Sequence, residues 1–423
     1  MSPPAPDPGP ATTSAGSPLP LALRVTNRLT RPLGRKLIRL EDHELVVRAM
    51  KRTALDDLGD DRISEPLGVL SRALDEEAHL HTFGRATARA QLVGLLSTRL
   101  RVADLIRRVP EITATPVVAP IIVIGMPRTG TTLLQRLIAQ DPGLRSLPYW
   151  EAREPLPRKV DAARQDAPTA DRIKRAVGSV KLLDRVAPEM KSMHELDPLG
   201  ADEESWLLGV DLATMLFEAT WHVPSFAEWY DSADLTRGYQ WLRTVLQVLQ
   251  WYRPGERWIL RSPQHLEQLG PLLSVFPDAT VVQTHRDPVR VVESFASMIS
   301  YGRHIASDSV DPVTIRKYWS WRIGVMLRRS MEQRPPGDLR FIDVQFTDLM
   351  ADPCATVGRI YEAADRELSD ETLGLMRRWL AANLPGGHGA HGSRVSDQGL
   401  DDATVRRGFS DYTEHFGVAI ERP

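Results

Sequence analysis

A glycine- and threonine-rich segment has the residue types needed to bind a phosphate-like anion. Residues 125–132 read Gly-Met-Pro-Arg-Thr-Gly-Thr-Thr and lie between a β-branched apolar run and a helical pattern. Two glycines allow a tight turn whose backbone N–H groups point inward, and the following helix N-terminus adds partial positive charge. The segment therefore predicts an anion site, with contacts expected from Arg128, Thr129, Gly130, Thr131 and Thr132.

The loop has the spacing of a Walker A motif but lacks its lysine. Position 131, where a nucleoside triphosphatase carries the lysine that reaches the β- and γ-phosphates, holds a threonine. A P-loop kinase or nucleotide hydrolase would also need an acidic Mg²⁺ ligand at a strand end, and Asp343 is the available candidate. This enzyme class remains the alternative reading of the loop.

A second anion site is predicted around Arg286 and Ser294, in the sequence Val-Val-Gln-Thr-His-Arg-Asp-Pro-Val-Arg-Val-Val-Glu-Ser. Arg286 directly follows an expected strand, and Asp287 and Pro288 are suited to the N-cap and first position of the next helix. Ligands of doubly wound sheets bind at the carboxyl ends of strands. Arg286 is therefore expected at the same edge as the glycine-rich loop.

The hydrophobic patterns predict an α/β fold with a P-loop-like parallel sheet flanked by helices. Strands expected near 116–126, 257–261, 279–285 and 339–345 alternate with helical patterns, as a parallel sheet requires. Residues 1–18 are expected to be a disordered tail, 19–113 a helical N-terminal region, and 114–423 the P-loop-like domain. Within that domain, residues of about 160–255 are expected to be a helical insertion on the acceptor side.

Composition limits the classes of partner and the cellular compartment that are expected for the chain. The formal net charge is −2, so an anion site must be built locally, and no nucleic-acid partner is expected. No apolar run approaches the ~18 residues of a membrane span, and the N-terminus lacks a secretory pattern. A single cysteine, Cys354, cannot form an internal disulfide, and a cytoplasmic protein is expected.

The two motifs, in this order, resemble those of sulfotransferases that use 3′-phosphoadenosine-5′-phosphosulfate (PAPS). Residues 125–134 look like their 5′-phosphosulfate loop, and residues 284–294 look like their 3′-phosphate motif. The wider resemblance, from about residue 116 to the C-terminus, is to bacterial members of the general sulfotransferase family. Arg128 and Arg261 stand where many members carry lysine, and Phe346 stands where the family usually has tyrosine.

The resemblance implies an enzyme that transfers a sulfuryl group from PAPS to a hydroxyl of a small acceptor, with no metal required. It implies that Arg128 and the loop bind the 5′-phosphosulfate and that Arg286 and Ser294 bind the 3′-phosphate. Arg261 is expected to act on the bridging oxygen or the sulfuryl group. Residues expected to close over the nucleotide are Ser393 and Arg394.

The general base is left open between four residues. A glutamate at the place of Glu151 serves as base in the tyrosylprotein branch of the family. His194 and Glu203 lie in a segment typical of the bacterial relatives, and His265 follows Arg261 by four positions. Each of the four could instead be a polar residue satisfied within the fold.

The acceptor side is less defined by the sequence. An aromatic-rich segment predicts either a pocket for a lipophilic alcohol, phenol or glycolipid, or ordinary helical core. A non-catalytic adenosine bisphosphate binder is the remaining alternative function, and the oligomeric state stays open. The aromatic residues are Trp206, Trp221, Phe226, Trp229 and Tyr230.

Overall fold

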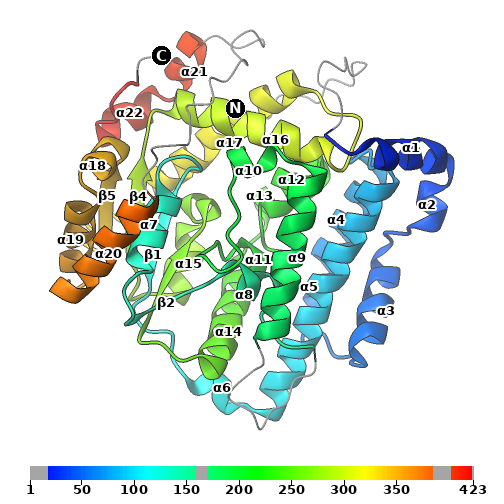
Figure 1. Cartoon of the computed structure of the whole chain (residues 1–423), viewed down its shortest axis with the longest axis horizontal. Coiled ribbons are helices and arrows are strands. Elements are labelled where there is room, and N and C mark those ends of the chain that lie inside the picture. Colours follow the sequence, from blue (N-terminus) through cyan, green and yellow to red (C-terminus); the bar gives the residue numbers. More distant parts are fainter. Residues whose placement is uncertain (1–17, 159–168, 384–401, 422–423) are drawn as a thin grey trace.

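The fold is built on a parallel sheet, seen in a computed structural model that describes residues 18–158, 169–383 and 402–421 (Figure 1). All pairings are parallel and the strand order is β2-β3-β1-β4-β5. The predicted α/β class is therefore confirmed. The strands are β1 (Ile121–Gly125), β2 (Leu144–Ser146), β3 (Arg257–Arg261), β4 (Thr280–His285) and β5 (Phe341–Gln345).

Helices precede the sheet and fill the long connection between β2 and β3. The first group is α1 (Leu21–Thr30), η1 (Arg31–Leu33), α2 (Gly34–Leu37), α3 (Asp42–Thr53), η2 (Asp61–Ile63), α4 (Ser64–Glu76), α5 (Thr82–Arg108) and α6 (Glu111–Ala114). After β1 comes α7 (Thr131–Ile138). The connection contains α8 (Tyr149–Arg153), α9 (Ala170–Val186), α10 (Met190–Met193), α11 (Ser205–Leu208), η3 (Gly209–Asp211), α12 (Leu216–Thr220), α13 (Pro224–Ser232) and α14 (Thr236–Tyr252).

The remaining helices alternate with the last strands and complete the C-terminal part. They are η4 (Pro263–Glu267), α15 (Leu269–Val275), α16 (Pro288–His304), α17 (Pro312–Gln333), α18 (Phe346–Ala351), α19 (Pro353–Ala363), α20 (Asp370–Asn383), α21 (Asp402–Gly408) and α22 (Ser410–Phe416). Asp287 caps α16 through a hydrogen bond from the backbone N–H of Val289, and Pro288 is its first residue, as predicted.

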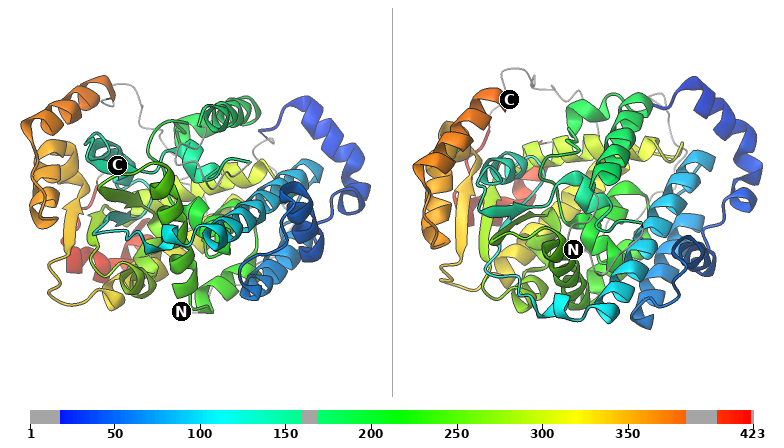
Figure 2. Two further views of the ribbon diagram at one scale, coloured as in Figure 1. Left: turned by 90° about the horizontal axis from the view of Figure 1, so that it is seen from below. Right: turned by 60° about the horizontal axis from the view of Figure 1, so that its bottom comes forward.

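Alternating side chains of β1 enter two different cores. Ile121 and Val123 pack with α7, α19 and α20 on one face of the sheet. Ile122 and Ile124 pack on the other face into the larger core, which includes α14–α17 and the N-terminal helices. Figure 2 shows these two layers with the sheet between them. A strand buried on both faces must be apolar throughout, which is why its sequence is so easily recognised.

Two strand predictions need correction. β1 begins at Ile121 rather than near residue 116, and Ala119 just before it has φ +39°. The edge strand β2 was not predicted, because it has three residues with Arg145 in the middle and no β-branched run. Its partner is β3, and the pairing fixes the position of the segment that leads into α8.

A residue without a side chain is needed at Gly125, where β1 turns into the loop. Its φ is +153°, and a Cβ would lie 2.1 Å from Thr284 Oγ1. Gly125→Ala should lower the free energy of unfolding by about 1–3 kcal/mol, measured by urea denaturation. Gly94→Ala is the matched control, since Gly94 is in α5 with open space around it, and should be neutral or stabilising. Equal stabilities of the two variants would contradict the steric argument.

Candidate active site

Three basic positions meet at one edge of the sheet because all strands point the same way. β1 is central, with β3 and β4 as its neighbours. Arg261 is the last residue of β3, the glycine-rich loop follows β1, and Arg286 follows β4. The carboxyl ends of these strands form the edge where α/β sheets bind ligands.

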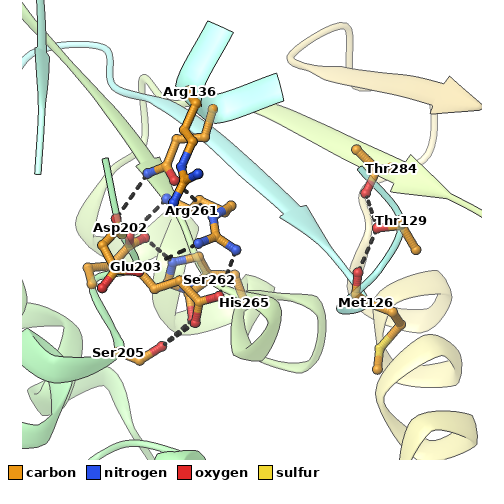
Figure 3. A network of polar contacts seen from close by, with 12 residues as sticks. Met126, Thr129, Arg136, Asp202, Glu203, Ser205, Arg261, Ser262, His265 and Thr284 are labelled. Carbon is orange, nitrogen blue, oxygen red and sulfur yellow. Dashed lines mark hydrogen bonds and ion pairs between the residues drawn. The ribbon is translucent and has the colours of Figure 1, made fainter. Parts of the chain in front are cut away.

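The loop after β1 is held by its own backbone and by β4. Arg128 has φ +72° and Gly130 φ +89°, so the loop curls tightly before α7 begins. The hydroxyl of Thr129 donates to the carbonyl oxygen of Met126 at 2.6 Å and lies 2.6 Å from Thr284 Oγ1 (Figure 3). Thr129 is buried, so its side chain ties the loop to β4. The N-terminus of α7 starts directly after it, at Thr131 and Thr132.

The two predicted anion motifs touch each other. Arg286 Nη1 donates to the carbonyl oxygen of Arg128 at 2.7 Å, and its guanidinium lies 4.0 Å from the ring centroid of Phe346. Burial and the neighbouring charge of Arg286 lower the pKa of the Arg128 guanidinium. Two adjacent cations at a helix N-terminus form a site that favours an anion. Ser294 lies half-buried in α16.

A carboxylate from the C-terminal segment already pairs with Arg286. Glu421 accepts from Arg286 Nε at 2.6 Å and from Nη2 at 2.8 Å. The backbone N–H of Glu421 donates to Asp287 Oδ2 at 3.0 Å, so the segment is anchored beside the arginine. A carboxylate in a bidentate pair with arginine has the geometry that a phosphate would take. The sequence did not point to Glu421, which lies 135 positions from Arg286.

Arg261 is buried and fixed by three neighbours. Its Nη1 donates to Glu203 Oε1 at 2.6 Å, and its Nε donates to Gln135 Oε1 at 2.8 Å. Gln135 is on α7, the helix that begins at the loop. The same helix therefore follows the loop and holds the guanidinium of Arg261. Asp202 Oδ1 lies 3.8 Å from Arg261 Nη2. Figure 3 shows Asp202 and Glu203 on the same side of Arg261.

Behind Arg261 is a buried chain of polar groups. Glu204 Oε2 accepts from the backbone N–H of Arg261 at 2.8 Å, and its Oε1 lies 2.6 Å from His265 Nε2. His265 Nδ1 is 2.7 Å from the hydroxyl of Tyr239. All three side chains are fully buried. His265 therefore supports the end of β3 from inside the core and does not face the edge of the sheet.

His194 lies near the glycine-rich loop, and Glu203 contacts Arg261. The backbone around His194 is held by Arg128, which donates to the carbonyl oxygen of Met193 at 3.4 Å, and by Arg136, which donates to that of Glu195 at 3.4 Å. His194 is half-buried. Glu203 keeps 24% of its side chain exposed while contacting Arg261.

Glu151 lies in a different environment. It is 2% exposed, and its Oε2 accepts from Arg145 at 2.7 Å and from Arg253 at 3.1 Å. Burial raises the pKa of the Glu151 carboxyl, and Arg145 opposes this shift. Through these contacts the residue links β2, α8 and the end of α14.

The acidic residue considered for a Mg²⁺ site is also engaged. Asp343 is in the middle of β5 and accepts from His285 and Arg334, which hold the pKa of its carboxyl well below the usual range. Within the described ranges, no group of three or more His, Cys, Asp or Glu side chains could hold a metal ion. Neither does any helix there combine the length and apolar composition that crossing a bilayer requires.

Most of the predicted aromatic set is core. Trp221, Phe226 and Tyr230 are nearly or fully buried, and Phe226 packs edge-on against Phe217 with centroids 5.5 Å apart. Trp206 differs, because it is half-buried next to Ser205 and its ring lies 3.5 Å from the guanidinium carbon of Arg153. Ser393 and Arg394 lie outside the described residues.

The comparisons with known proteins identify this arrangement. Residues 120–370 match the sulfotransferase family. The chain belongs to the sulfotransferase family. It is 24% identical over 329 residues to the omega-hydroxy-beta-dihydromenaquinone-9 sulfotransferase Stf3 of Mycobacterium bovis, covering 75% of this chain and 77% of that protein. The Mycobacterium tuberculosis protein of the same name matches equally.

Two solved structures share the fold of this sulfotransferase over nearly their whole length. Sulfotransferase STF9 from Mycobacterium avium superimposes with a TM-score of 0.82 at 29% identity, covering 90% of this chain and 98% of that one. STF1 from Mycobacterium tuberculosis gives a TM-score of 0.76 at 31% identity, covering 87% and 98%. The predicted family, fold and enzyme class are thus confirmed.

The pairing of Glu421 with Arg286 predicts competition with a phosphate. Glu421→Gln should strengthen binding of adenosine 3′,5′-bisphosphate by roughly 2- to 5-fold, the scale of a partly exposed ion pair. Calorimetric titration measures the effect, and Glu414→Gln on the exposed side of α22 is the matched control. An unchanged or weaker affinity of the Glu421 variant would show that the carboxylate does not compete.

Proposed function

We propose that this sulfotransferase uses PAPS as donor and transfers its sulfuryl group to a hydroxyl of a small lipophilic or glycosidic acceptor. The observation that carries the proposal is the contact of Arg286 with the loop at Arg128. PAPS carries anionic groups on both sides of its ribose, so two adjacent cationic sites at one sheet edge suit it. In this assignment the loop residues Thr129–Thr132 and Arg128 bind the 5′-phosphosulfate, and Arg286 with Ser294 binds the 3′-phosphate.

The residues at the edge would act mainly by positioning and by charge. In an in-line transfer the acceptor oxygen forms a bond to sulfur while the bond from sulfur to the 5′-phosphate oxygen breaks, and charge spreads over the sulfuryl oxygens. Arg261 would stabilise that charge or the leaving oxygen. Its burial at 4% exposure strengthens such an interaction, because little water screens it.

A general base would take the proton of the acceptor hydroxyl, and we assign this role to Glu203. It is a carboxylate that contacts Arg261 and remains partly exposed. His194 is the rival, since its backbone is held next to Arg128. Glu151 and His265 are less suited, because their polar atoms are engaged in buried pairs with Arg145 and with Glu204.

The acceptor assignment rests on the relatives and on one half-buried tryptophan near Glu203. Stf3 is named for a dihydromenaquinone acceptor with an omega-hydroxyl. In this chain Trp206, covered by Arg153, directly follows Ser205, whose hydroxyl is 3.2 Å from Glu203 Oε2. In this assignment the lipophilic acceptor lies beside Trp206 with its hydroxyl near Glu203.

The alternatives are weaker on specific grounds. A P-loop kinase or nucleotide hydrolase would need a lysine where this chain has Thr131. It would also need a carboxylate for Mg²⁺, but Asp343 is already paired with His285 and Arg334. A non-catalytic adenosine bisphosphate binder would need no cation at Arg261. The buried support of that arginine by Gln135 and Glu204 favours catalysis.

Removal of the Arg286 guanidinium should affect ligands with a 3′-phosphate far more than ligands without one. Arg286→Ala should weaken binding of adenosine 3′,5′-bisphosphate by roughly 10- to 100-fold, because charge-assisted hydrogen bonds to the 3′-phosphate are lost. Binding of adenosine 5′-phosphate should weaken much less, through the lost contact of Arg286 with the loop. Arg359→Ala, an exposed arginine in α19, is the control. Equal losses for both nucleotides would remove the 3′-phosphate role.

Two glutamate variants separate catalysis from structure. Glu203→Gln should lower turnover by roughly 10²–10⁴-fold with little change in nucleotide affinity, because a base is lost. Glu151→Gln should instead lower the free energy of unfolding by about 3–5 kcal/mol, because it leaves buried arginine charge uncompensated. Turnover with PAPS and thermal denaturation are measured for both. Normal turnover of Glu203→Gln together with a loss in His194→Ala would transfer the base role to His194.

A further inference from the structure

The first described segment of the chain, residues 18–40, is strongly basic. We call it the N-terminal arm; it comprises α1, η1 and α2. It holds six cationic residues and no acidic one, although the whole chain has a net charge of −2. All six are exposed, and they are Arg24, Arg28, Arg31, Arg35, Lys36 and Arg39.

Large apolar side chains of the arm point into solvent at every fourth position. Leu21 is 67% exposed, Val25 48%, Leu29 74%, Leu33 51% and Leu37 57%. Within α1 a spacing of four keeps them on one face of the helix. Scattered exposed leucines are ordinary, but a row of this kind indicates an interaction surface.

The face of α1 that packs on the protein is partly polar. Asn27 is 4% exposed and its Oδ1 accepts from the backbone N–H of Phe83 at the start of α5. Thr30 donates to Thr82 Oγ1 at 2.7 Å. A surface helix of a globular protein normally buries its apolar stripe. Here polar groups attach the helix, and the apolar side chains are left exposed. The helix itself lies at the rim of the molecule (Figure 2).

Basic residues run beside the apolar row. Arg24, Arg28 and Arg31 follow one another at helical spacing, next to the face that carries Leu21, Val25 and Leu29 in α1 and its continuation. An apolar face flanked by arginines is typical of helices that lie in the interface of a bilayer.

We propose that the N-terminal arm binds the surface of an anionic lipid bilayer. The apolar row enters the boundary between headgroups and acyl chains, and the arginines beside it contact the anionic headgroups. Charge complementarity selects this occupant over a second copy of the chain, because two arms face to face would bring twelve cations together. Lipid binding does not depend on the proposed function. With a lipophilic acceptor, the arm would hold the enzyme at the surface in which that acceptor resides.

Flotation of the full-length protein with vesicles tests the proposal. The protein should float with vesicles of phosphatidylcholine and phosphatidylglycerol, and much less with phosphatidylcholine alone. Added salt should reduce the binding, because counterions screen the headgroup charge. Equal flotation with both lipid compositions, or with neither, would overturn the proposal.

Removal of the apolar row should weaken the partition coefficient at least about tenfold. The variant is Leu21→Ser/Val25→Ser/Leu29→Ser, and the control is Leu182→Ser, a leucine 58% exposed in α9. Because these side chains are solvent-exposed, circular dichroism and thermal denaturation should be unchanged. Unaltered flotation of a folded triple variant would exclude the arm as the membrane contact.

Removal of the charges should act through the anionic lipid only. Arg24→Gln/Arg28→Gln/Arg31→Gln should lower partition roughly 100-fold on anionic vesicles. Arg377→Gln/Arg378→Gln, exposed in α20, should have no effect. Sedimentation velocity tests whether a second copy of the chain covers the apolar row instead. The lipid proposal would be overturned if the wild-type protein is a dimer that the serine variant dissociates and neither protein floats with vesicles.

Discussion

The arrangement at the sheet edge depends on the hydrogen bond from the Arg286 guanidinium to the carbonyl oxygen of Arg128, which brings two cationic residues into neighbouring positions. Arg286 directly follows β4, and Arg128 is in the loop after the neighbouring strand β1. The parallel order of the strands, the curl of the loop and the contact of Thr129 with Thr284 together bring the two residues into contact. Like charges repel unless an anion lies between or beside them. The bidentate carboxylate of Glu421 meets that need within the chain, and a phosphate would meet it in a complex.

The position of Arg261, the third cation at the edge, is fixed by hydrogen bonds with neighbouring residues and with the core. Arg261 is buried, and Gln135, Glu203 and Glu204 fix its side chain and its backbone. Glu204 continues through His265 to Tyr239 in the core, so the position of the guanidinium is coupled to packing far from the edge. Buried polar groups of this kind stay only where all are satisfied. Electrostatic stabilisation of a transferring group requires such preorganisation.

The sequence was informative where one local pattern determines the geometry. The loop at residues 125–132 and Arg286 follow apolar strands, and the direction of a parallel sheet places both at one edge. Long-range pairs could not be predicted: Glu151 meets Arg253, 102 positions away, and the three-residue strand β2 has no hydrophobic signal. Periodicity also could not separate a pocket from a core, so Trp221, Phe226 and Tyr230 became known as core residues only from their burial.

The central claim is that one nucleotide spans the loop and Arg286. A crystal structure of the sulfotransferase with adenosine 3′,5′-bisphosphate tests it most directly. The account predicts the 5′-phosphate on the backbone N–H groups of residues 128–132 and the 3′-phosphate hydrogen-bonded to Arg286 in place of Glu421. A nucleotide bound with its 3′-phosphate away from Arg286, while Glu421 keeps its pairing, would contradict it.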